Sequence, residues 1–352
     1  MILPPEVPSA SRAWSPEHLR LHRHLLRQPE LLPAGSPLLV AVSGGQDSMA
    51  LVSLLLGLQR LHGWKLSLWH GDHRWYGRSA EQAGSLGQWA QERRLRLHVD
   101  RAAVAPKGEN EARRWRYACL ERTARQEGCS HVVTGHTASD RAETVLLNLA
   151  RGSHRRGLAS LRSRRALEDD FGSQQDHRPA LWLVRPLLIF SRAETATICS
   201  SLGLPIWIDP SNEDLSMARN RLRARVMPVL EELHPGACHR ISALAERLAM
   251  EQEKGGELLD LALRPLEIPS QDGVPSLARQ RLSQASVVMQ GRLLQRWLER
   301  HWGGNLEASH LDGLLASLVR KGSRGQRDLR GGWQIHWDPA KLTLVCLPQV
   351  HG

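Results

Sequence analysis

Cysteine is scarce in this chain, and its spacing argues against two common kinds of metal site. The 352 residues include five cysteines, an odd number, and no two of them form a C-x-x-C pair. Zinc ribbons and iron–sulfur sites commonly use such pairs. We therefore expect free thiols in a reducing compartment. The cysteines are Cys119, Cys129, Cys199, Cys238 and Cys346.

Long apolar runs are also missing. No segment approaches the roughly 20 apolar residues that span a membrane. The N-terminus carries Pro4, Pro5 and Pro8 where a secretory signal would have a hydrophobic core. The sequence therefore predicts a cytoplasmic protein without a membrane span.

Lysine is rare although the chain is strongly basic. Lysine and arginine together number 47, the formal net charge is +11, and nearly all the basic residues are arginines. Such an excess predicts a polyanionic partner or an anionic membrane surface. Arginine presents forked donors that suit phosphates and base edges. The length allows two or three domains, each with its own core.

A Walker A sequence is absent, yet one glycine-rich turn has the context of a phosphate site. The apolar run Leu38–Val42 predicts a buried strand, and the apolar run after Ser48 predicts a helix. Glycines allow the chain to approach a ligand closely, and the N–H groups that open a helix favour phosphate. We expect ATP to bind at this turn, formed by Ser43, Gly44, Gly45, Gln46, Asp47 and Ser48. The alternative is an ordinary strand-to-helix turn.

Strands and helices alternate along the first half of the chain. The expected strands are Leu38–Val42, Lys65–Trp69, Leu95–Val99 and His131–Thr134, and the helices between them are Met49–Leu61, Ser79–Arg94 and Glu111–Gln126. This order predicts a doubly wound, mostly parallel α/β sheet that binds ligands at the carboxyl ends of its strands. A further strand is expected at 205–209, and helices dominate after Met217, with a small hairpin at 326–347. Ser15-Pro16 predicts a helix start with the serine as N-cap. We expect an N-terminal segment and helix (1–36), a catalytic domain (37–215) and a mainly helical domain (216–352).

The turn resembles the pyrophosphate loop S-G-G-x-D-S of the PP-loop ATP pyrophosphatases, which split ATP between the α and β phosphates. Downstream, the chain carries Asp209-Pro-Ser-Asn212 and then Ala218-Arg-Asn-Arg-Leu-Arg-Ala-Arg-Val-Met-Pro-Val-Leu230. These stretches are similar to the D-x-S-N and R-N-x-x-R-x-x-x-x-P-x-L patterns of the tRNA(Ile)-lysidine synthase family. The resemblance covers about residues 40–235.

Further motifs agree with this family, each with a plainer alternative. Asp72 and His73 follow a strand. Glu109, Arg113 and Arg116 match E-x-x-A-R-x-x-R-Y, and the two arginines are three apart on one helix face. The alternative is a solvated basic helix face. His136, Asp140, Glu143 and Thr144 match G-H-x-x-D-D-Q-x-E-T, whereas Ser139 and Arg141 replace its first aspartate and its glutamine. The loss of one carboxylate leaves Asp140 as the single strong candidate for Mg²⁺. The alternative for Glu143 is charge compensation at a helix N-terminus.

The resemblance implies that ATP and L-lysine modify the wobble cytidine of the isoleucine tRNA with a CAU anticodon. Catalytic roles then fall to Asp47, Arg113 and His136, and a rim for lysine or nucleotide to Asp72, His73, Glu109 and Glu143. The tRNA would contact Arg151, Arg155, Arg156, Arg219, Asn220 and Arg223. Separately, Arg292, Arg296 and Arg300 are spaced four apart on one helix face, so we expect them to contact further phosphates. Arg223 is alternatively a structural arginine that pairs with Asp209 or Asp214. No obligate protein partner is evident.

Two other interpretations share the ATP turn. A tRNA thiolase would need suitably placed reactive cysteines, and an amidating synthetase an ammonia source and no basic helical domain. A non-catalytic RNA-binding relative is a different class, suggested only by Ser139 and Arg141. Release of pyrophosphate separates these interpretations.

Overall fold

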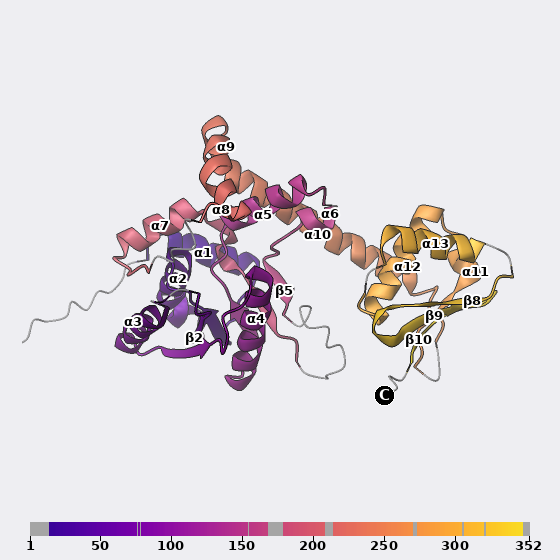
Figure 1. The fold of residues 1–352 in the computed structure, drawn as a ribbon, viewed down its shortest axis with the longest axis horizontal. Helices are drawn as coiled ribbons and strands as arrows, with labels where there is room; N and C mark the ends of the chain where they lie inside the picture. The colour runs from indigo at the N-terminus through magenta and orange to yellow at the C-terminus, as the bar shows by residue number, and fades with distance from the viewer. Residues whose placement is uncertain are drawn as a thin grey trace, which may run out of the picture. The chain divides into compact units, whose positions relative to one another are not determined.

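The apolar run after Ser36 forms the central strand of a six-stranded sheet in the computed structural model (Figure 1). The structure describes residues 14–75, 77, 79–153, 155–167, 179–207, 214–269, 273–304, 306–319 and 322–347. They belong to two compact units, Met1–Ala249 and Met250–Gly352.

The sheet of the first unit has the predicted class. Its strand order is β3-β2-β1-β4-β6-β5, and every pair is parallel except the edge pair β5–β6. The bounds are β1 Pro37–Ala41, β2 Lys65–Asp72, β3 Arg96–Arg101, β4 His131–Val133, β5 Arg164–Ala166 and β6 Trp182–Val184. The strand order reverses at β1, because β2 and β3 lie on one side of it and β4, the next strand along the chain, lies on the other. The crevice between β1 and β4 is therefore the expected ligand site of a doubly wound sheet.

Helices follow the strands of this sheet, and those after β1, β2 and β3 lie where apolar periodicity predicted them. Their bounds are α1 Pro16–Arg27, α2 Gln46–His62, α3 Ser79–Glu92, α4 Glu109–Gln126, α5 Ala138–Ala150, α6 Arg155–Leu158 and α7 Arg192–Ser201, with the 3-10 turn η2 Pro186–Ile189. Helix α2 is the core of the unit, because Met49–Leu55 is buried on consecutive positions. Helix α1 begins after Ser15, whose hydroxyl caps it as expected.

The helical segment that follows belongs to the first unit up to Ala249, beyond the boundary expected near residue 216. It comprises α8 Ala218–Arg221, the π-turn η4 Leu222–Val226, α9 Met227–Leu233 and α10 Ala237–Leu263. Met227 and Cys238 pack on Ala138 of α5 in one buried cluster. This apolar contact ties the start of the helical segment to α5.

The second unit combines helices with a larger sheet than the expected hairpin. Its antiparallel order is β7-β10-β9-β8, with β7 Ser276–Ala278, β8 Gly325–Asp328, β9 Trp333–Trp337 and β10 Lys341–Cys346. The helices are α11 Arg279–Leu282, α12 Val287–His301 and α13 Ala308–Val319, packed around the fully buried Trp297. Strand β7 is too short for a period-2 pattern to be visible in the sequence.

The expected strand at 205–209 is absent over its described part, residues 205–207. The Trp207 N–H instead donates to the Gly44 carbonyl at 3.0 Å, so this segment lies against the glycine-rich turn. Residues 208–213, which include Asp209, Ser211 and Asn212, lie outside the described residues. Across the described ranges, no helix has the length and apolar character needed to cross a bilayer.

His131, the first residue of β4, should make the first unit acid-labile. Burial lowers the pKa of His131 to about 4, aided by the nearby Arg164 charge. Between pH 6.5 and 4 the unfolded chain therefore binds a proton that the folded chain refuses, and stability is lost as pH falls. Over this pH range the free energy of unfolding falls by about 3 kcal/mol.

The substitution His131→Gln should flatten this pH dependence. Urea unfolding midpoints measured from pH 4 to pH 7 check the prediction. An unchanged slope in the variant would show that other groups control the acid transition.

Candidate active site

A cavity of about 400 Å³ opens at the carboxyl ends of β1, β2 and β4. It brings together most of the residues that the sequence motifs singled out. Among its lining residues are Ser43, Asp47, Ser48, Asp72, His73, Glu109, Arg116, His136, Asp140, Arg192, Arg219, Asn220 and Arg223. Segments from residue 43 to residue 223 therefore converge on one site.

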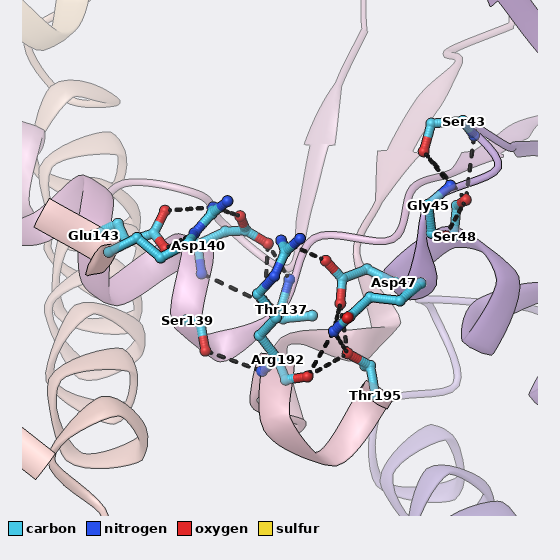
Figure 2. A network of polar contacts seen from close by, with 12 residues as sticks. Ser43, Gly45, Asp47, Ser48, Thr137, Ser139, Asp140, Glu143, Arg192 and Thr195 are labelled. Carbon is cyan, nitrogen blue, oxygen red and sulfur yellow. Dashed lines mark hydrogen bonds and ion pairs between the residues drawn. The ribbon is translucent and has the colours of Figure 1, made fainter. Parts of the chain in front are cut away.

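Hydrogen bonds between its own residues hold the shape of the glycine-rich turn (Figure 2). The Ser43 and Ser48 hydroxyls lie 3.2 Å apart, and the Ser48 hydroxyl also donates to the Gly45 carbonyl at 2.8 Å. Gly44 has a φ of +83°, and a Cβ there would lie 2.9 Å from the Gln82 amide nitrogen. The N-cap of helix α2 is Gly45, which has no side chain to accept a hydrogen bond from the first N–H groups of the helix. Its first N–H groups can thus serve an anion.

Asp47 stands at the first turn of α2, held from α7. Its carboxylate accepts hydrogen bonds from the Arg192 guanidinium at 3.0 Å and from the Thr195 hydroxyl at 2.5 Å (Figure 2). Burial raises the pKa of Asp47, and the Arg192 charge opposes that shift. Arg192 lines the cavity but carries no sequence motif. The only signal was its place beside the helix-capping Ser191.

His136 and Asp140 follow β4 on the opposite side of the crevice. The His136 Nδ1 lies 2.9 Å from the Thr134 hydroxyl. Burial, with the Arg185 charge, lowers the pKa of His136 to about 3, so its ring is neutral at pH 7. Asp140 accepts the Thr137 N–H at 2.8 Å and so completes the capping box of α5, whose N-cap is Thr137. Burial alone would raise the pKa of Asp140, but the Thr137 N–H and the charges of Arg223 and Arg219 lower it.

Glu143 is not presented at a rim as expected, because α8 and the π-turn cover it. Its side chain is 1 % exposed. The Arg223 guanidinium donates to both Glu143 oxygens at 2.7 and 2.9 Å, and Arg219 lies 3.4 Å away. A bidentate pair of this kind fixes geometry as well as charge. Charge compensation at a helix end does not describe it.

Arg219, Asn220 and Arg223 therefore build the site, although the sequence pattern suggested tRNA contacts. Arg219 donates to the Thr144 hydroxyl at 2.7 Å, and the Asn220 amide donates to the Asp214 carbonyl at 3.0 Å. Arg223 reaches Asp140 at 3.5 Å as well as Glu143. Arg223 therefore has a structural pairing with Glu143, and Asp209 lies outside the described residues.

Arg116, and not Arg113, is the arginine of α4 that lines the cavity. The Arg113 guanidinium is exposed and lies over the Tyr117 ring at 4.9 Å. The two are three residues apart, so helical spacing put them near one face without ranking them. Arg116 donates to the His73 Nε2 at 3.4 Å.

The rest of the rim comes from β2 and its following turn. Asp72 is 3 % exposed and accepts the Arg74 N–H at 2.8 Å. The His73 ring stacks on Trp75 with centroids 5.0 Å apart. Glu109 is largely exposed and lies 4.0 Å from Arg219. These groups make one edge of the cavity acidic and aromatic.

The two departures from the family pattern have structural explanations. The Ser139 hydroxyl accepts the Arg192 N–H at 3.0 Å (Figure 2), so it supports the start of α7. Arg141 is 3 % exposed, donates to the Leu161 carbonyl and pairs with Glu246 at 2.5 Å. It therefore ties α5 to α10. Neither residue signals a lost active site.

Other expected RNA contacts lie elsewhere. Arg151 is exposed at the end of α5, and the side chains of Arg155 and Arg156 lie outside the described set. In the second unit, Arg296 pairs with Asp260 at 2.6 Å and Arg300 with Glu267 at 3.2 Å. Acidic residues of α10 and its following turn thus neutralise much of the face that helical spacing predicted to be basic.

The donor set fits Mg²⁺ only as an ion shared with phosphates. Within the described ranges, no three His, Cys, Asp or Glu side chains gather in a metal-binding group. Asp47 and Asp140 both line the cavity, and Mg²⁺ is often held by one or two carboxylates together with substrate phosphates and water.

The cysteines do not suit a thiolase. Cys119, Cys129, Cys199 and Cys238 are buried. Burial raises the pKa of Cys129, Cys199 and Cys238 to about 11. Thiols of this kind are protonated at neutral pH, whereas sulfur chemistry uses the thiolate.

Comparison with known proteins agrees with the geometry. A family model described as a PP-loop domain matches residues 20–230. A tRNA(Ile)-lysidine synthase of Parasynechococcus marenigrum (strain WH8102) is 48% identical over 94% of this chain and 95% of that protein. Another, from a strain of Prochlorococcus marinus, is 40% identical over 95% of this chain and 97% of that protein. A solved U34-tRNA thiolase of Methanococcus maripaludis shares the fold at 17% identity, with a TM-score of 0.53 over 66% of this chain and 78% of that one.

Proposed function

The chain belongs to the tRNA(Ile)-lysidine synthase family of PP-loop proteins, and on this basis we propose that it ligates L-lysine to C2 of the wobble cytidine in the isoleucine tRNA with a CAU anticodon. ATP supplies the driving force, and AMP and pyrophosphate are released. The observation that carries the proposal is the single cavity in which the ATP turn, Asp47, His136 and Asp140 meet.

The first step is adenylation of the base. The cytosine O2 attacks the α-phosphate of ATP, an O–P bond forms, and the bond to pyrophosphate breaks. The N–H groups at the start of α2 hold phosphate. Arg116 and Arg192, both lining the cavity, stabilise the negative charge that grows on the leaving pyrophosphate. Asp47 and Asp140 would hold Mg²⁺, which would supply positive charge between the phosphate oxygens.

The second step transfers lysine. The neutral ε-amine attacks C2, a C–N bond forms, and the bond from C2 to the AMP oxygen breaks. The amine proton needs an acceptor. His136 is a poor base because its pKa is about 3, so we assign it hydrogen bonding to a substrate. Asp47 and Asp72 remain as acceptors of this proton. Glu109 and His73 remain as groups that receive the α-ammonium of lysine.

The tRNA must deliver its wobble base to the cavity. The wobble base must leave its loop to enter a cavity of about 400 Å³, as enzymes that act on a base commonly require. Arg151 on the exposed end of α5 would then contact phosphates beside it. We place the reaction in the cytoplasm, where tRNA and ATP occur together, and we propose no obligate protein partner.

A pyrophosphate-release assay tests the function. ATP should be cleaved in the presence of the cognate tRNA, and lysidine-containing tRNA should appear only when lysine is added. A tRNA thiolase would leave lysine unused, and a non-catalytic relative would release no pyrophosphate. Either outcome would reject the proposal.

The metal assignment predicts the behaviour of Asp140→Asn. Asparagine keeps the cap of α5 but removes the charge that faces the cavity. The Mg²⁺ concentration for half-maximal pyrophosphate release should therefore rise, by about tenfold for the loss of one charged ligand. Asp312→Asn in α13 is the control, because this exposed carboxylate does not line the cavity. An unchanged magnesium dependence in Asp140→Asn would restrict Asp140 to capping its helix.

A further inference from the structure

A second and larger hollow of the first unit lies between α1, η2 and the first half of α10. Its volume is about 880 Å³, more than twice that of the catalytic cavity. We call it the α1–α10 groove. Its wall includes Arg141, whereas the preceding residue Asp140 lines the catalytic cavity. Helix α5 therefore contributes to both hollows.

The groove combines an apolar floor with an excess of cations. Leu19, Leu188 and Ile189 are among its apolar lining residues. Its single acidic lining residue among those described, Glu246, is already paired with Arg141 at 2.5 Å. Arg20 is likewise engaged with Glu194 at 2.5 Å.

Three lining arginines are left over. Arg23, Arg27 and Arg247 are exposed, and within the described part of the chain none of them has an ion-pair partner. Arg23 and Arg27 lie one helical turn apart on α1, where like charges at this spacing repel each other. Burial lowers the pKa of the adjacent His24, so the charge of the groove comes from its arginines.

The arrangement matches a chain of phosphates better than one small anion. The guanidinium groups that have no ion-pair partner among the described residues come from two helices, α1 and α10, and both helices line the hollow. Arg23 and Arg27 are about 6 Å apart along the helix axis, comparable with successive phosphates of one strand. The apolar floor suits the faces of ribose rings.

We propose that the α1–α10 groove binds the sugar–phosphate backbone of the tRNA, away from the nucleotide that reacts. The proposal deepens the function given above and rests on it. Arginine contacts with phosphate position a nucleic acid without reading its sequence. The groove would thus contribute affinity and orientation, while the cavity selects the base.

Charge reversal tests the proposal. We expect each of Arg23→Glu, Arg27→Glu and Arg247→Glu to raise the Kd for full-length cognate tRNA about tenfold. The slope of log affinity against log salt should fall by roughly 0.7–0.9 for each arginine that no longer binds a phosphate. Arg60→Glu is the matched control, since Arg60 is exposed at the end of α2 and does not line the groove.

Kinetics separate this role from catalysis and from folding. The KM for tRNA should rise in the groove variants, while kcat at saturating tRNA and the KM for ATP stay at the wild-type values. Melting temperatures should not fall, because each reversal relieves repulsion within the cluster. Wild-type tRNA affinity and salt slope in all three variants would overturn the groove proposal.

The two proposals fail in different ways. If the wild-type protein makes no lysidine but the groove variants bind tRNA more weakly, the catalytic proposal alone fails. If the wild-type protein makes lysidine and the variants bind tRNA as it does, only the groove proposal is lost.

Discussion

Asp47→Asn should abolish pyrophosphate release, with a loss of at least about 10²–10³-fold, the range seen when one preorganised charged or polar group is removed from a reaction centre. The carboxylate lies at the start of α2, lines the cavity and is held by Arg192 and Thr195. Asparagine has nearly the same shape but cannot carry the charge that would attract Mg²⁺ and orient Arg192. The effect should therefore appear in kcat, measured with saturating tRNA and lysine.

Asp100→Asn is the matched control for this experiment. Asp100 also pairs with an arginine, Arg122, at 2.5 Å, and is partly exposed, but it lies in β3, outside the cavity lining. It should retain near-wild-type activity. Near-wild-type rates in Asp47→Asn would remove Asp47 from the catalytic residues.

Arg223→Ala should strongly destabilise the first unit. Glu143 would remain buried, with Arg219 at 3.4 Å as its nearest cation. Removing one partner of a buried pair typically costs about 3–5 kcal/mol. For a unit of this size that corresponds to a fall in melting temperature of about 6–20 °C. Thermal melts followed by circular dichroism measure it, and Arg327→Ala in the second unit should have a much smaller effect.

A double variant separates the structural role from a catalytic one. Replacing both partners with apolar residues, in Glu143→Met with Arg223→Met, should recover much of the lost stability, because no charge is then left buried and unpaired. If stability returns and pyrophosphate release does not, the pair also orients Asp140, which Arg223 contacts at 3.5 Å. If Arg223→Ala melts as the wild type does, the structural role assigned to Arg223 is wrong.

Local sequence patterns predicted the parts of this fold that local patterns control. The strand Leu38–Val42 and the helix after Ser48 appear as β1 and α2 within a few residues, because one apolar run and one glycine-rich turn define both. The cap at Ser15 was equally visible. The short strand β7 and the packing of α9 and α10 on α5 were not, since they depend on contacts between distant segments.

The residues of the candidate site likewise fall into those that local patterns predict and those that depend on contacts between distant segments. The turn at Ser43–Ser48 and the rim at Asp72 could be located in the sequence, because each comes shortly after an apolar run that predicts a strand. Arg192 was missed, since its contact with Asp47 joins residues that are far apart in the chain. Arg113 was preferred to Arg116 because helical spacing cannot show which of two neighbouring arginines faces the cavity.

The burial of the cysteines has a practical consequence for spectroscopy. Four of the five thiols are packed inside the first unit, and burial raises their pKa. Cys346, the last residue of β10, is exposed. A maleimide dye reacts with an accessible thiolate far faster than with a buried thiol. The natural chain thus offers one selective attachment point, and a fluorophore there would report on the second unit as tRNA is added, without any cysteine of the catalytic unit being replaced.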